Sequence, residues 1–212
     1  MNQKIENLHR LENAALNRLL RRALARAAPA IHSLTPAPPA TSGPLQILDL
    51  ACGTCRESGT LAQVFREFDG NGREVRLVGT DIRDRELEEA DARSKLVRQP
   101  GDQFEFFREN GTKMHRHQLL GSDFDVTFLR HQNYWNDQAV WERIFGQGLE
   151  RLKENGLLVI TSYFDREHAL ALEALQRSGA ELLVSERNEA SRVLDTPGKS
   201  VDRHLAIFRR KE

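Results

Sequence analysis

The chain has 212 residues, of which 29% are charged, and its 31 basic and 31 acidic side chains give a formal net charge of zero. This length suits one α/β domain with an appendage and is sufficient to bury a core. The balanced charge excludes a general basic field that would draw the chain onto nucleic acid or anionic lipid.

We expect neither a membrane span nor a signal peptide from the sequence. No segment has the run of about 18 apolar residues that a membrane span needs. The first residues lack the compact apolar stretch of a signal peptide. We therefore expect a cytoplasmic protein, a monomer or homodimer, with no membrane contact and no strong nucleic-acid signal.

The first 44 residues differ in character from the rest of the chain. Residues 1–28 predict one amphipathic helix, because apolar side chains recur at near-helical spacing among Arg and Glu residues. Residues 29–44 contain five prolines and predict a linker or extended arm. We expect an N-terminal helix and Pro-rich arm over residues 1–44, and one domain over residues 45–212. The helix is equally compatible with a lid, a docking element and a purely structural support.

Strand and helix patterns alternate from residue 45 onward. Strands are expected at residues 45–51, 75–82, 103–110, 124–132, 157–164, 181–188 and 203–211. Helices are expected at residues 57–68, 84–98, 137–153 and 165–178, the third of them stopped by Asn155 and Gly156. This order predicts an α/β fold: a doubly wound, mostly parallel seven-stranded sheet with an antiparallel last strand, helices on both faces and an N-terminal helical arm.

Ligands of such sheets bind at the carboxyl ends of the strands, near the point where the strand order reverses. Asp49 ends the first strand and is followed by a turn of small residues, Ala51 to Cys55. Small residues let a ligand approach the backbone, and the next helix offers amide donors. Asp81 ends the second strand, where a carboxylate can accept hydrogen bonds from both hydroxyls of a ribose. The alternative interpretation is that Asp49 and Asp81 only cap the following helices.

The turn does not suit a phosphate. Neither a G-x-G-x-x-G sequence nor a P-loop with its lysine occurs, and Asp49 places an anion where a pyrophosphate would lie. A ligand with a ribose, a positive or zwitterionic group and no phosphate is favoured. S-adenosylmethionine has these features.

Four stretches resemble the class I S-adenosylmethionine-dependent methyltransferases: "ILDLACGTC", "LVGTDI", "FDVTFLRHQNYW" and "LERLKENGLLVITSYF". The resemblance covers about residues 45–211 and implies a Rossmann-like methyltransferase that uses S-adenosyl-L-methionine. Ala51 and Cys55 stand where that family usually has glycines, and we expect Cys55 to narrow the pocket beside the methionine end.

The same resemblance implies positions for the cofactor. Asp49 would bind the amino group of the methionine part, Asp81 the ribose, and Ile82 would pack on adenine, with Glu109 or Asn110 beside it. The full set of expected cofactor-binding residues is Asp49, Ala51, Cys52, Gly53, Thr54, Cys55, Asp81, Ile82, Glu109, Asn110, Gly111 and Arg130.

The stretch "RHQNYW" at residues 130–135 crowds polar and aromatic residues at a strand end. Methyl transfer requires a positioned nucleophile and, for a hydroxyl or amine, removal of a proton. His131 is the expected base, Arg130 the expected partner of a substrate carboxylate, and Tyr134 and Trp135 the expected lining of the acceptor pocket. The plainer interpretation is a hydrogen-bonded structural His131 and a core Trp135. Tyr163, after the fifth strand, is a further acceptor-side candidate.

Several functions remain open at this point. The C-x-x-C pair Cys52 and Cys55 lacks the second ligand pair of a zinc site, so no metal is expected. Arg130 and His131 disfavour an aminopropyltransferase, whose polyamine substrate is cationic. We expect methyl transfer to a small-molecule acceptor, for which Arg130 suggests a carboxylate, or to a protein side chain. The alternative is a non-catalytic protein that binds S-adenosylmethionine or S-adenosylhomocysteine and acts through its N-terminal helix.

Overall fold

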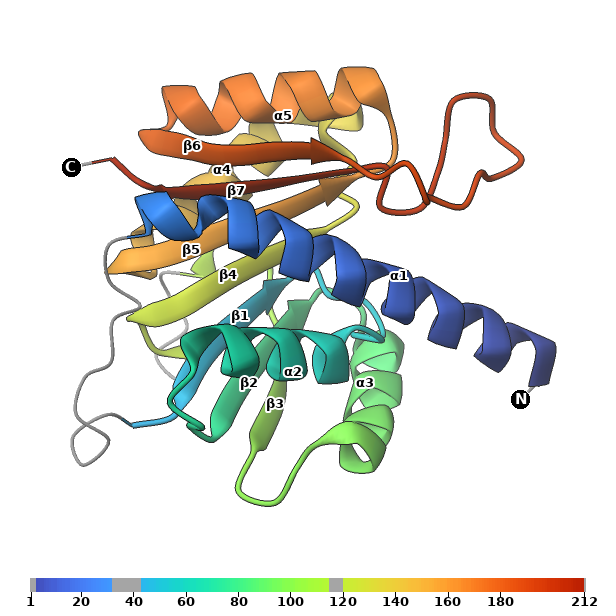
Figure 1. Ribbon diagram of the computed structural model, residues 1–212, viewed down its shortest axis with the longest axis vertical. Helices are drawn as coiled ribbons and strands as arrows, with labels where there is room; N and C mark the ends of the chain where they lie inside the picture. Colours follow the sequence, from blue (N-terminus) through green and yellow to red (C-terminus); the bar gives the residue numbers. More distant parts are fainter. Residues whose placement is uncertain (1–2, 32–42, 115–119, 212) are drawn as a thin grey trace.

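The computed structural model describes residues 3–31, 43–114 and 120–211, so most of the Pro-rich arm lies outside the described residues. The described strands form one seven-stranded sheet in the order β3-β2-β1-β4-β5-β7-β6 (Figure 1). The strands are β1 (Leu45–Leu50), β2 (Val75–Asp81), β3 (Gln103–Arg108), β4 (Phe124–Arg130), β5 (Leu152–Ser162), β6 (Ala180–Arg187) and β7 (His204–Arg210). Only β7 runs antiparallel to its neighbours, β5 and β6. The predicted fold class is confirmed.

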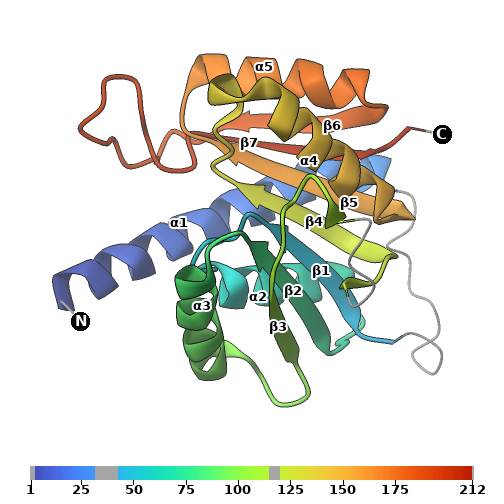
Figure 2. The same ribbon diagram turned by 180° about the vertical axis from the view of Figure 1, so that it is seen from behind.

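Helices cover both faces of the sheet. They are α1 (Gln3–Ala27), α2 (Ser58–Asp69), α3 (Asp84–Val97), α4 (Gln138–Glu150) and α5 (Asp165–Arg177), with short 3-10 turns η1 (Ala28–Ala30) and η4 (Tyr134–Asn136). One core cluster joins α1, α2 and α3 to the sheet, and a second joins α4 and α5 to the other face (Figure 2). Among the described helices, none is both long and apolar enough to cross a membrane.

Helix α1 packs into the hydrophobic core through its second half. Its buried residues follow helical spacing and begin at Leu16: they are Leu16, Leu19, Leu20, Ala23, Leu24 and Ala27. Each buried leucine stabilises the packed helix by roughly 1.5–3 kcal/mol. Ile5 and Leu11 in the first half are 46% and 63% exposed. Figure 1 shows this first half extending beyond the sheet toward the N-terminus.

The boundary between α4 and β5 differs from the prediction. Helix α4 ends at Glu150 and β5 already begins at Leu152, so the helix expected to residue 153 and the strand expected from 157 are both wrong there. The pairing with β4 shifts between Phe124 and Val126, which marks a bulge. A Cβ on Gly156 would lie 2.8 Å from the carbonyl oxygen of Phe124. Gly156 therefore permits a close approach inside the strand instead of ending the helix.

A buried histidine links α5 to the end of β5 and to β6. The Nδ1 of His168 is 3.1 Å from the Ser162 hydroxyl, and its Nε2 is 3.0 Å from the Ser185 hydroxyl. Its ring stacks on His204 with 4.5 Å between the ring centroids. Burial, followed by the charge of His204, lowers the pKa of His168 to about 3.

This depressed pKa predicts an acid-sensitive fold. The unfolded chain takes up a proton on His168 below the ordinary histidine pKa of 6.5, whereas the folded chain does so only near 3. Stability from this group is therefore lost as the pH falls below 6.5, by about 2 kcal/mol near pH 5. Urea unfolding should show that His168→Gln loses about 2 kcal/mol less than the wild type between pH 7.5 and pH 5. Parallel pH profiles would contradict this expectation.

Candidate functional site

The turn after β1 is held open by three residues in the left-handed region. Ala51, Gly53 and Cys55 have φ values of +54°, +54° and +42°. The amide of Cys52 donates to the Thr80 carbonyl at 2.9 Å, which ties the turn to β2. The backbone thus adopts a glycine-type path although only one of the three residues is glycine.

Ala51 pays a conformational cost at this position, which can be measured. A non-glycine residue at positive φ costs on the order of 1 kcal/mol. Ala51→Gly is therefore expected to stabilise the protein by about 0.5–1 kcal/mol in urea unfolding. The control is Ala25→Gly, an exposed position within α1, which should destabilise by a similar amount. A loss of stability in both variants would contradict the assigned strain.

Asp49 and Cys55 lie beneath the turn and line neither cavity described below. Both are 0% exposed, and the Cys55 thiol donates to Asp49 Oδ2 at 3.1 Å. Burial and the nearby Glu57 carboxylate raise the pKa of Asp49 well above its usual range. Asp49 thus supports the turn from inside, and its Oδ1 has no hydrogen-bond partner among the described residues. The cofactor contacts expected of Asp49 and Cys55 remain predictions.

Two cavities meet at Ala51, at the carboxyl ends of the strands. The smaller has a volume of about 340 Å³ and is lined, besides Ala51, by five more of the predicted residues: Asp81, Ile82, Glu109, Asn110 and Gly111. The larger has a volume of about 550 Å³, and its lining includes Cys52, Gly53, Thr54, Arg130, His131 and Tyr163. Most of the predicted cofactor residues, and the candidate base, thus line one or the other of two cavities that share Ala51.

Asp81 stands where the turn meets the smaller cavity. Its Oδ2 accepts a hydrogen bond from the Gly53 amide at 2.8 Å, and its Oδ1 accepts one from Arg83 Nε at 2.9 Å. Burial by itself raises the pKa of Asp81, but the bonds from Arg83 and Gly53 outweigh it and lower that pKa. The carboxylate is therefore charged, and the exposed Arg83 covers its outer side.

Glu109 and Asn110 both line the smaller cavity, so the prediction of one or the other is resolved into two different environments. The side-chain oxygen of Asn110 already accepts from the amide and the hydroxyl of Thr112, at 3.0 and 2.8 Å. Glu109 Oε1 accepts from the Asn110 amide at 2.8 Å. The second oxygen of Glu109 is thus the better-placed acceptor for a ligand amino group.

Arg130 is neutralised within the protein. Its Nε and Nη2 donate to the two oxygens of Asp202 at 3.0 and 2.6 Å, and its Nη1 donates to Glu57 at 3.1 Å. Although burial opposes it, these two carboxylates raise the pKa of Arg130. Because two buried carboxylates already pair with Arg130, it has no remaining charge for the carboxylate of a substrate, which is the role expected of it from the sequence.

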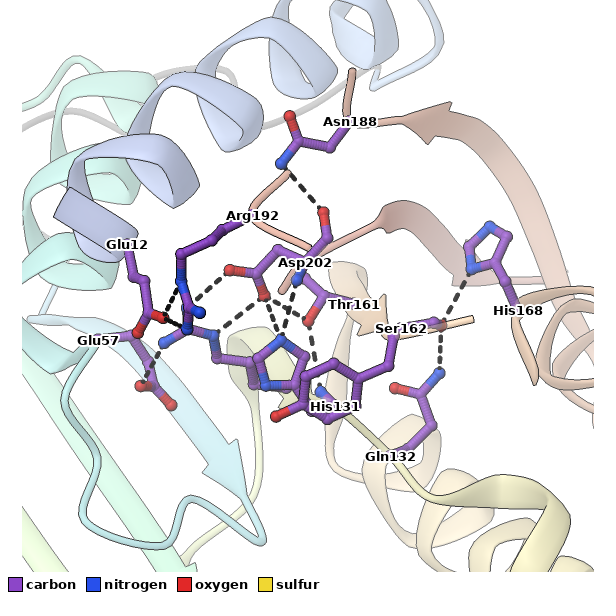
Figure 3. A network of polar contacts seen from close by, with 12 residues as sticks. Glu12, Glu57, His131, Gln132, Thr161, Ser162, His168, Asn188, Arg192 and Asp202 are labelled. Atoms are coloured by element: carbon purple, nitrogen blue, oxygen red, sulfur yellow. Dashed lines mark hydrogen bonds and ion pairs between the residues drawn. The ribbon is translucent and has the colours of Figure 1, made fainter. Parts of the chain in front are cut away.

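His131 lines the larger cavity, and Figure 3 shows it beside Asp202. Its Nε2 is 2.8 Å from Asp202 Oδ1, and its ring stacks on Tyr163 with 3.8 Å between centroids. Nε2 also lies 3.1 Å from the Asp202 amide. One nitrogen cannot donate to the carboxylate and accept from the amide, and we assign its proton to the shorter contact. Nδ1 of the neutral ring then carries the free lone pair.

Tyr134 and Trp135 do not line the cavities. The Tyr134 side chain is 2% exposed, stacks beside Phe145 and donates its hydroxyl to Glu142 at 2.8 Å. Trp135 packs against Phe164 with 4.6 Å between ring centroids. The expected catalytic role of Tyr134 is therefore wrong, because the 3-10 turn η4 directs it into the core under α4. Tyr163 instead provides the aromatic surface beside His131.

The site contains residues that the sequence did not single out. Asp202, just before β7, orients both Arg130 and His131, and Glu57 comes from the start of α2. Helix α1 contributes Leu8, His9 and Glu12 to the lining of the larger cavity. Glu12 binds Arg192 of the β6–β7 loop, as Figure 3 shows. The first half of α1 is thus part of the site wall.

No protein-family model matches the chain, and no curated protein matches it. Solved structures match the fold. The magnesium protoporphyrin IX methyltransferase from Synechocystis, with bound S-adenosylmethionine, shares 15% identity over 93% of this chain and 81% of that one, with a TM-score of 0.62. The N-methyltransferase NodS from Bradyrhizobium japonicum shares 15% identity over 92% of this chain and 96% of that one, with a TM-score of 0.59. The [4+2]-cyclase SpnF shares 18% identity over 82% of this chain and 60% of that one, with a TM-score of 0.56. At identities this low, the structural matches are evidence of a common fold alone.

Proposed function

We propose that this protein binds S-adenosylmethionine and methylates an acceptor beside His131. The proposal starts from the fold, which is that of the class I S-adenosylmethionine-dependent methyltransferases. The observation that carries the proposal is the junction of two cavities at Ala51, with Asp81 lining one and His131 the other. Two adjoining cavities suit a cofactor and an acceptor that must meet.

The residues present fit this cofactor. The charged Asp81 is placed to accept hydrogen bonds from ribose hydroxyls, and Ile82 and Trp141 give the smaller cavity apolar surface for adenine. Glu109 offers an acceptor for the adenine amino group. Bound S-adenosylmethionine would supply a methyl group activated by a positively charged sulfur.

The acceptor side supports proton removal. Asp202 holds the Nε2–H of His131, so Nδ1 is available to take a proton from a hydroxyl or amine. Tyr163 fixes the plane of the imidazole by stacking. Because Arg130 is neutralised, it no longer argues for a carboxylate-bearing substrate, and we retain both a small molecule and a protein side chain as acceptor classes.

Calorimetric titration with S-adenosylmethionine and S-adenosylhomocysteine tests the cofactor, and transfer of label from methyl-labelled cofactor to fractionated acceptors tests the reaction. We expect micromolar binding, and His131→Ala should reduce transfer about a hundredfold while binding changes little. Binding without any transfer would favour the non-catalytic alternative, which none of the structural neighbours favours. No binding would refute the proposed function.

A further inference from the structure

Four arginine side chains line the larger cavity, and three of them are neutralised by carboxylates. The three ion pairs are Arg83 with Asp81, Arg130 with Asp202, and Arg192 with Glu12. The fourth, Arg56, forms no ion pair with any residue that the structure describes. Among these four arginines, Arg56 is therefore the one left to pair with an anionic group of a ligand.

The only side-chain contact recorded for the Arg56 guanidinium within the described chain is with a neutral partner. Its Nη1 bonds to Nε2 of His9, which α1 contributes. Burial, together with the charge of Arg56, lowers the pKa of His9 below its ordinary value of 6.5, so the imidazole remains uncharged near neutral pH. The Nε of Arg56 is buried and has no hydrogen-bond partner among the described residues. Both a charge and a donor are thus available.

Arg56 also lies next to the expected path of the cofactor. It directly follows the turn of residues 51–55 and precedes α2, whose amino end adds a partial positive charge. The Gly53 amide, three residues earlier, bonds to Asp81. A ligand with its ribose at Asp81 that crosses the turn at Gly53 enters the larger cavity on the side of Arg56.

We infer that Arg56 binds the carboxylate of the amino-acid part of S-adenosylmethionine, an inference that rests on the proposed function. The planar guanidinium suits a carboxylate through two parallel hydrogen bonds. His9 positions it from α1 without neutralising it. A carboxylate on the acceptor is the other source of the same chemistry, and the position of Arg56 beside the turn favours the cofactor.

The test compares ligands that differ by the carboxylate alone. Calorimetry with S-adenosylmethionine and with decarboxylated S-adenosylmethionine is carried out on the wild type, Arg56→Gln and Arg56→Lys. Arg56→Gln should weaken S-adenosylmethionine at least tenfold and change the affinity for the decarboxylated ligand less than twofold. Arg56→Lys, which keeps a point charge, should weaken S-adenosylmethionine by severalfold. The control Arg85→Gln removes a charge from a 90% exposed side chain and should change neither affinity.

The outcomes separate this inference from the proposed function. Equal losses for both ligands, or unchanged binding of S-adenosylmethionine by Arg56→Gln, would overturn the role of Arg56 while the wild type still binds. Unchanged binding of S-adenosylmethionine by Arg56→Gln is also the result expected if Arg56 binds a carboxylate of the acceptor. A wild type that binds neither ligand would overturn the proposed function and the inference together. Should thermal unfolding show that Arg56→Gln is not folded, Arg56→Lys carries the same comparison.

Discussion

Replacing Asp81 with alanine is expected to weaken the binding of S-adenosylmethionine by about a hundredfold. Hydrogen bonds to a charged group contribute roughly 1.5–3 kcal/mol each, and a carboxylate at this position can accept two from a ribose. A combined loss of about 3 kcal/mol corresponds to a factor of about 100 in affinity. The variant also removes the acceptor of the Gly53 amide, which is 2.8 Å away and holds the turn against β2.

Two further variants identify the cause of that loss in calorimetry. Asp81→Asn keeps an oxygen for Gly53 without the charge and should give an intermediate affinity. Arg83→Ala uncovers the carboxylate; because Arg83 is 56% exposed, its ion pair is worth about 1 kcal/mol or less, so binding should tighten by at most about fivefold. Wild-type affinity in Asp81→Ala would mean that the ribose does not bind at Asp81.

Replacing Asp202 with asparagine is expected to destabilise the fold by about 3 kcal/mol. The Asp202 side chain is 2% exposed and accepts from Arg130, His131 and Thr161, all within 3.0 Å. Removing one partner of a buried ion pair typically costs 3–5 kcal/mol, because the other charge remains buried. Glu57 still pairs with Arg130, which places the expectation at the lower end. Urea unfolding near neutral pH measures the difference.

The control for this variant is Asp195→Asn in the same β6–β7 loop. Asp195 is exposed, and its replacement should change stability by less than about 0.5 kcal/mol. Equal stability of Asp202→Asn and the wild type would refute the importance of the buried network.

The pH dependence provides a second signature of Asp202. Burial alone would raise the pKa of Asp202, but the charge of Arg130 and the hydrogen bonds from Arg130 and His131 hold it well below its usual range. Its contribution is therefore present above the unfolded value of 3.8 and is lost as the pH falls below it. The stability difference between the wild type and Asp202→Asn should shrink in the same range.

The residues that surround the turn after β1 were largely predictable from the sequence, because their placement depends on local patterns. An apolar run that ends in Asp49, a small-residue turn and Asp81 at the next strand end determine which residues meet at Ala51. Even there, strand alternation could not show that Cys55 points inward, since the chain leaves the strand geometry at Ala51. The bulge at Gly156 was missed because asparagine followed by glycine is usually a turn.

The acceptor side was not predictable, because its geometry depends on distant segments. The partner of Arg130 lies 72 residues away along the chain, and no spacing rule connects them. Tyr134 was misassigned because the strand period no longer applies in η4, where the backbone follows a 3-10 path. No sequence pattern pointed to Arg56, because its significance depends on its having no carboxylate partner among the described residues of the folded chain.

The position of β7 between β5 and β6 has a consequence for the order of folding. Strand β6 pairs only with β7, so it cannot join the sheet until the later strand has docked against β5. Asp202 immediately precedes β7 and reaches Arg130 only in that step. Contacts of such long sequence separation form slowly, because the intervening chain must close first. A folding intermediate with β1 to β5 in place would therefore have the turn after β1 but not the His131 network, and the larger cavity would be completed last.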